Sequence, residues 1–180
     1  MTRRFPRLAP LAAAVALAAA CTAPRAARAP DAAPADFQVS YGWSTGALPP
    51  QYVYGYTVRL GPGSGGRLDF RPSYDTTTWT ASFPVSAGQL DSLYALFRAR
   101  GVFDREWPQG TPMAGGTAEG LEATAGGRTV RLPDPPAEAD RAAIRELYGA
   151  VEALVPAGLV SGMVERRQRK ARGEDSSPVR

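Results

Sequence analysis

The stretch Tyr52–Arg71, YVYGYTVRLGPGSGGRLDFR, decides the class of fold. From Tyr52 to Leu60, apolar and aromatic side chains fall on alternate positions, which is the period of a β-strand with one buried face. The glycine-rich run at 61–66 breaks the strand, and alternation resumes over 67–71. Two alternating runs joined by a short glycine-rich break predict a β-hairpin, and hairpin connections favour an antiparallel sheet.

Three further segments have the strand pattern. Residues 76–83 are rich in threonine and place Trp79, Ala81 and Phe83 on one side. Residues 118–125 and 128–132 flank Gly126-Gly127, a pair typical of a two-residue hairpin turn. These segments predict a sheet built from at least two hairpins.

The segment after residue 83 carries complete signals for a helix over 87–100. Ser86 is a favourable N-cap, and Gln89 stands where a capping box requires it. Gly101 suits the left-handed position that ends a helix, and Val102 can close the motif on the last turn. The apolar positions follow helical spacing: Leu90, Leu93, Tyr94 and Phe97.

A second helix is predicted to begin at Asp134-Pro135-Pro136, because proline is tolerated in the first turn of a helix. Pro156 is predicted to end it. Its apolar face consists of Ile144, Leu147, Tyr148, Val151, Leu154 and Val155. We therefore expect an α+β fold, a small antiparallel β-sheet with two amphipathic helices packed on one face.

The N-terminus has the layout of a secretory signal over residues 1–20. Three arginines precede an uncharged, alanine-rich stretch at 8–20, which is too short and too weakly apolar to span a membrane. Leu17-Ala18-Ala19-Ala20-Cys21 resembles a bacterial lipobox, although leucine stands four rather than three residues before the cysteine. The resemblance implies that Cys21 is fatty-acylated and holds the protein at the outer membrane, facing the periplasm. Cleavage by an ordinary signal peptidase is the alternative, with Cys21 an incidental thiol.

Composition divides the rest of the chain into three parts. Residues 21–36 are an Ala/Pro tether predicted to be disordered, 37–164 form a single domain, and 165–180 are a basic tail also expected to be disordered. The chain has a net charge of +4, but the domain holds ten arginines against twelve acidic residues, so its own net charge is −2. The charge therefore gives no support for nucleic-acid binding.

The chain contains no histidine and one cysteine. These counts exclude Ser-His-Asp and Cys-His catalysis, histidine-containing zinc sites and internal disulfides. The matches to G-x-S-x-G at 42–46 and G-x-G-x-x-G at 61–66 lack the following helix that each motif needs. We expect no metal, no cofactor and no enzyme activity. The remaining acidic pairs are interpreted as solvated surface groups: Asp104 with Glu106, and Glu119 with Glu122.

Aromatic residues supply the candidate binding positions. Tyr41, Trp43 and Tyr52 flank the loop at 44–51, and Trp107 lies in a Gly/Pro-rich loop. Tyrosine and tryptophan combine a large apolar area with a polar tip, which suits a binding surface. Tyr54 and Tyr56, in contrast, are expected to be core residues.

Together these features predict a lipid-anchored cell-envelope protein whose domain has a non-catalytic structural or binding role. Its expected partners are the membrane, through the lipid on Cys21, and another envelope protein or a peptidase. The order of elements over 56–155, with a capped helix that ends in Gly101-Val102-Phe103, resembles that of emfourin-type peptidase inhibitors. That resemblance implies inhibition of an extracytoplasmic peptidase. No inhibitory residue is carried over, because the Gly-Gly-Phe-like segment of that family has no match here.

Overall fold

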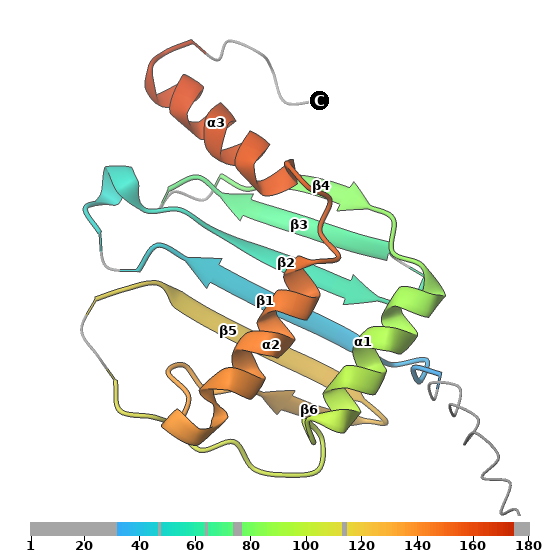
Figure 1. Ribbon diagram of the computed structural model, residues 1–180. Helices are drawn as coiled ribbons and strands as arrows, with labels where there is room; N and C mark the ends of the chain where they lie inside the picture. The colour runs from blue at the N-terminus through green and yellow to red at the C-terminus, as the bar shows by residue number, and fades with distance from the viewer. Residues whose placement is uncertain (1–31, 47, 64, 74–76, 113–114, 175–180) are drawn as a thin grey trace, which may run out of the picture.

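The computed structural model describes residues 32–46, 48–63, 65–73, 77–112 and 115–174 (Figure 1). The predicted signal at 1–20, Cys21 and the first part of the tether lie outside the described residues. The elements are β1 (Gln38–Ser44), η1 (Pro50–Tyr52), β2 (Gly55–Gly61), β3 (Gly65–Arg71), β4 (Trp79–Phe83), α1 (Ala87–Ala99), β5 (Ala118–Ala125), β6 (Arg128–Arg131), η2 (Glu138–Asp140), α2 (Arg141–Glu152) and α3 (Leu159–Ala171).

The strands form one antiparallel sheet in the order β4-β3-β2-β1-β5-β6. The predicted hairpins, β2–β3 and β5–β6, are both present. The strand that joins them is β1, which pairs with β2 on one side and β5 on the other, so that Tyr41 stands opposite both Val58 and Leu121. The sequence analysis missed β1 as a strand, because its aromatic residues were interpreted as a binding surface.

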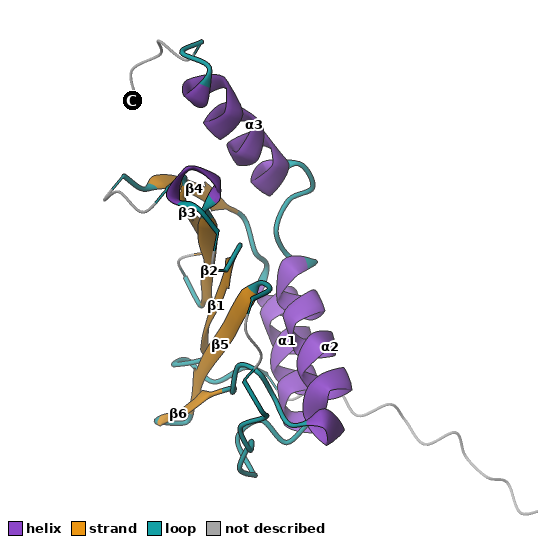
Figure 2. Ribbon diagram, turned by 90° about the vertical axis from the view of Figure 1, so that its left-hand side faces the viewer, coloured by secondary structure: helices purple, strands orange, loops and turns teal. Residues whose placement is uncertain are grey.

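The α+β prediction is confirmed, and α1 and α2 lie side by side on one face of the sheet (Figures 1 and 2). The capping box of α1 forms as predicted. The Ser86 side chain accepts a hydrogen bond from the Gln89 amide at 3.2 Å, and the Gln89 side chain accepts one from the Ser86 amide at 2.8 Å. At the other end, Gly101 has φ of +68°, and the Val102 amide donates to the Phe97 carbonyl at 2.9 Å. This bond is the Schellman closure of the helix.

The second helix begins later than predicted. Its first turn is the 3₁₀ segment η2, and α2 itself starts at Arg141. The segment at 135–137 instead forms hydrogen bonds with the loop at 108–110. The Gly110 amide donates to the Pro135 carbonyl at 2.8 Å, and the Ala137 amide donates to the Pro108 carbonyl at 3.2 Å. These bonds across the molecule replace the expected first turn of the helix.

The ordered chain extends beyond both predicted domain boundaries. The ordered chain includes residues 32–36, where the Ala33 amide donates to Asp91 of α1 at 2.8 Å. Asp36 accepts from the amides of Gly126 and Gly127, at 2.9 and 2.6 Å, and these bonds lower the pKa of its carboxyl. At the other boundary, residues 165–171 of the predicted disordered tail belong to α3. Within the described residues, no helix has the length and apolar composition needed to cross a bilayer.

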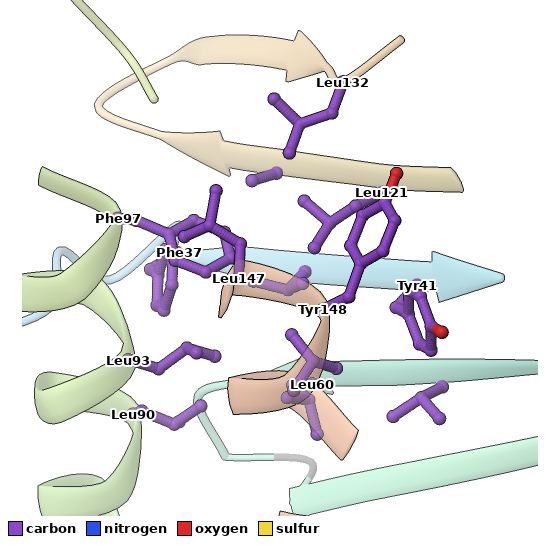
Figure 3. Packing of buried hydrophobic residues seen from close by; sticks show 14 of the residues in the cluster. Phe37, Tyr41, Leu60, Leu90, Leu93, Phe97, Leu121, Leu132, Leu147 and Tyr148 are labelled. Atoms are coloured by element: carbon purple, nitrogen blue, oxygen red, sulfur yellow. The ribbon is translucent and has the colours of Figure 1, made fainter. Parts of the chain in front are cut away.

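The core lies between the sheet and the helices, where alternate strand residues meet the apolar faces of α1 and α2 (Figure 3). Its largest fully buried side chains are Tyr41, Phe37, Phe70, Phe97, Leu68, Leu121, Leu132, Ile144, Leu147, Val39, Val58 and Val102. The predicted inward residues of β5 and of both helices are buried except for Tyr94, Leu154 and Val155, which are half-buried and pack against the core. The alternation and most of the helical spacing are therefore confirmed.

Phe97→Ala is expected to destabilise the fold by about 3–5 kcal/mol, because it leaves a cavity at the centre of the core. Phe97 has no solvent exposure, whereas Leu48 is 45% exposed. Urea unfolding measures the loss, and Leu48→Ala is the control, expected to change stability by about 0.5 kcal/mol or less. Equal effects of the two substitutions would contradict the assigned core.

Candidate functional site

The structure places the four candidate aromatic residues in different environments. Tyr41 is only 1% exposed and belongs to the core, so its prediction as a surface binding residue was wrong. Trp43 and Trp107 are half-buried, and Tyr52 in η1 is 58% exposed. Trp107 lies apart from the other three, beside the uncovered face of the sheet.

Tyr41 and Trp43 belong to a continuous row of rings on the helix-covered face. Neighbouring centroids in this aromatic row are 5.1–6.3 Å apart, a spacing at which aromatic pairs attract. Tyr56 is buried as predicted, and Tyr54 packs against the core. The row runs through Tyr148, Tyr41, Tyr56, Trp43, Tyr54, Phe70 and Trp79.

Helix α3 contacts the far end of this row through its basic side chains. The Arg166 guanidinium lies 4.5 Å from the Trp79 ring centroid, and that of Arg167 lies 5.3 Å from the Tyr54 ring. Arg167 also donates from Nε to the Pro72 carbonyl at 2.6 Å. Cation–π contacts of this kind stabilise by about 0.5–1 kcal/mol at exposed sites. The basic residues predicted to lie in a disordered tail therefore hold α3 against the sheet.

Two hydroxyls of the row, those of Tyr41 and Tyr56, act as neutral donors. Tyr41 and Tyr56 both donate to Oε1 of Glu152, at 2.9 and 3.1 Å. Burial raises the pKa of both hydroxyls far above the usual tyrosine range, and the negative charge of Glu152 raises it further. A tyrosine held protonated in this way provides a fixed hydrogen bond and no nucleophile.

The opposite face of the sheet is polar, and Figure 2 shows no helix over it. The registers align one polar row across all six strands, in the order Ser82, Arg67, Arg59, Ser40, Glu122 and Arg131. A hollow of about 660 Å³ opens on this face beside the centre of that row. Its volume falls within the range of about 300–1,000 Å³ that is usual for ligand sites.

Two glycines form the floor of this hollow. Gly42 of β1 stands directly opposite Gly120 of β5, and both line the cavity. A Cβ atom at Gly120 would meet nothing within 4 Å, and one at Gly42 would make only ordinary contacts at 3.9 and 4.0 Å. The fold therefore has no steric need for glycine at either position. Glycine inside a strand weakens it and often marks the close approach of a ligand or another backbone.

Trp107 and Gln109 form a fixed rim at one side of the hollow. The Trp107 indole donates to the Val102 carbonyl at 3.3 Å, and the Arg105 guanidinium lies 3.6 Å from its ring centroid. Arg105 in turn pairs with the buried Asp140 at 2.7 Å. Gln109 donates to the carbonyl of Asp134 at 2.7 Å. The rim is therefore held in place by contacts within its own loop and to the segment between β6 and α2.

Glu119 and Glu122 lie on opposite faces of the sheet. Glu119 stands opposite Trp43 on the helix-covered side, and Glu122 stands opposite Ser40 on the open face, as their odd spacing requires. Glu122 pairs with Arg131 at 2.9 Å. Burial raises the pKa of Glu119, and the nearby charges of Glu152 and Asp134 raise it further. Within the described part of the chain, no group of three His, Cys, Asp or Glu residues could hold a metal ion.

The two glycine motifs also lie on strands. Residues 42–44 of the G-x-S-x-G match belong to β1, and the G-x-G-x-x-G match spans the β2–β3 connection. Neither has the geometry of a nucleophile elbow or a dinucleotide loop, because both motifs place their functional groups at the start of a helix.

Comparison with models of known protein families finds no match for this chain, and comparison with curated proteins finds none. The resemblances to lipoproteins and to emfourin-type inhibitors therefore stay predictions.

Gly120→Ala is expected to stabilise the protein by about 0.5–1 kcal/mol, because alanine costs less backbone entropy than glycine within a strand. Gly55→Ala is the control, since a Cβ at Gly55 would come within 2.7 Å of the Trp43 carbonyl oxygen and must destabilise. Urea unfolding of both variants provides the measurement. A loss of stability in Gly120→Ala would mean that the fold itself requires this glycine.

Proposed function

We propose that this protein is a lipid-anchored component of a bacterial cell envelope whose α+β domain binds another envelope component without catalysis. The anchor rests on the signal-like segment at 1–20 and on Cys21 directly after it. Ten residues, 22–31, separate that cysteine from the first described residue. A fully extended chain of that length reaches at most about 35 Å, so the proposed anchor keeps the domain close to the bilayer.

The hollow on the uncovered sheet face is the observation that carries the binding role. Its floor is bare backbone at Gly42 and Gly120, and Trp107 stands at its rim. Its charged groups are Glu122 and Arg131, which neutralise each other, and Asp134, which accepts a hydrogen bond from the Glu119 amide at 3.0 Å. A concave surface with an aromatic rim and few charges favours a binding site over an acid–base site.

The proposed anchor is tested with Cys21→Ser. We expect the lipidated protein to fractionate with membranes and to dissolve in detergent, and the variant to be neither acylated nor membrane-bound. A single saturated chain gives only marginal membrane binding, whereas two or more anchor stably, so loss of the acylated cysteine must show clearly in fractionation. A variant that remains processed and equally membrane-bound would disprove the anchor.

The proposed binding face is tested by cross-linking and pull-down from native envelopes. Gly120→Val fills the floor of the hollow, and we expect it to reduce capture of the specific partner by about tenfold, as for a central interface position. Gly149→Ala is the matched control, because Gly149 is exposed on α2 and its Cβ would also meet nothing within 4 Å. Undiminished capture by a correctly folded Gly120→Val would place binding elsewhere.

A further inference from the structure

A second cavity, of about 410 Å³, lies where the end of α2 meets the start of α3. This elbow pocket is lined by Tyr56, Glu152, Val155, Pro156, Gly158, Val160 and Ser161. We propose that the elbow pocket binds an organic cation, a primary ammonium group carried on an apolar body.

The walls of the pocket suit an apolar body. Val155, Pro156 and Val160 provide aliphatic surface, and the Tyr56 ring forms an aromatic wall. That ring is stacked on Trp43 with an interplanar angle of 19° and a centroid separation of 5.5 Å. The stacking on Trp43 holds the Tyr56 ring at a constant position beside the cavity, so this wall of the pocket is preformed.

Glu152 supplies the negative charge. Its Oε1 accepts the hydroxyl hydrogens of both Tyr41 and Tyr56, which orient the carboxylate while the residue stays open to solvent. Among the described residues, no arginine or lysine lies within ion-pair distance of Glu152. The two tyrosine hydroxyls donate hydrogen bonds but leave the charge uncompensated.

The surroundings increase the negative potential. Glu152 is the last residue of α2, so its carboxylate adds to the negative end of the helix dipole. Glu119 and Glu152 are close enough to repel each other electrostatically, and Arg145 offsets part of the charge of Glu119. The N-terminus of α3 opposes this field with only about half an elementary charge. The balance at the pocket therefore favours a cation over a neutral or anionic ligand.

The test uses the full chain and three probes of similar size: phenethylammonium, phenethyl alcohol and phenylacetate. NMR titration is expected to show phenethylammonium shifting the amide signals of Tyr56, Val155 and Val160, with the alcohol about tenfold weaker and phenylacetate weaker still. N-acetyl-lysine methylamide, as a fourth probe, shows whether a side-chain ammonium binds as well as a free amine. Binding by either ammonium probe at these residues supports the proposal.

Glu152→Gln keeps the shape and the acceptor oxygen for the two tyrosines, so we expect it to fold normally. It should abolish the preference for the amine over the alcohol. Glu138→Gln removes an equal charge from an exposed residue paired with Arg141, and is expected to leave that preference unchanged. The proposal is overturned if neither ammonium probe binds, if the alcohol binds as tightly, or if Glu152→Gln keeps the preference. None of these outcomes bears on the hollow floored by Gly120.

Discussion

The pairing of β1 with both β2 and β5 is the constraint on which the rest of the structure depends. This strand joins the meander of β2–β4 to the β5–β6 hairpin, so without it the two halves of the sheet have no common ladder. Because side chains alternate along β1, the strand also places apolar residues on the helix-covered face and the glycine of the hollow on the open face. Tyr41 points to the helices and Gly42 to the open face, and a shift of one residue in the register would exchange them.

Local signals predicted the parts of the fold that local interactions determine. The capping box at Ser86 and the Schellman closure at Gly101 need only neighbouring residues, and both formed as expected. The start of α2 could not be predicted in the same way, because the carbonyl of Pro135 is bound by the distant Gly110 amide. The order at residues 32–36 likewise depends on Asp91 and on the β5–β6 turn, which are far away in the sequence.

The candidate site was predicted in part. Trp107 was selected as a candidate because it is aromatic, and it lies at the rim of the open hollow. The same reasoning also selected Tyr41, which is buried in the core. Sequence reasoning missed the floor, although one signal was available. Gly120 lies inside a predicted strand and not at a turn. A glycine in such a position indicates either a β-bulge or the close approach of another backbone or a ligand. Only the register, which sets Gly42 opposite it, distinguishes these two explanations.

The contacts of residues 32–36 also limit how the domain can face a membrane under the proposed anchor. Ala33 is tied to α1, and Asp36 to the β5–β6 turn, so the tether leaves the fold at the end of the sheet where β1 begins. Tyr56 and Trp43 stand opposite each other near the other end of β1. A seven-residue strand rises about 20–24 Å. The elbow pocket is therefore separated from residues 32–36 by about the length of β1, so under the proposed anchor it lies at the end of the sheet remote from the tether.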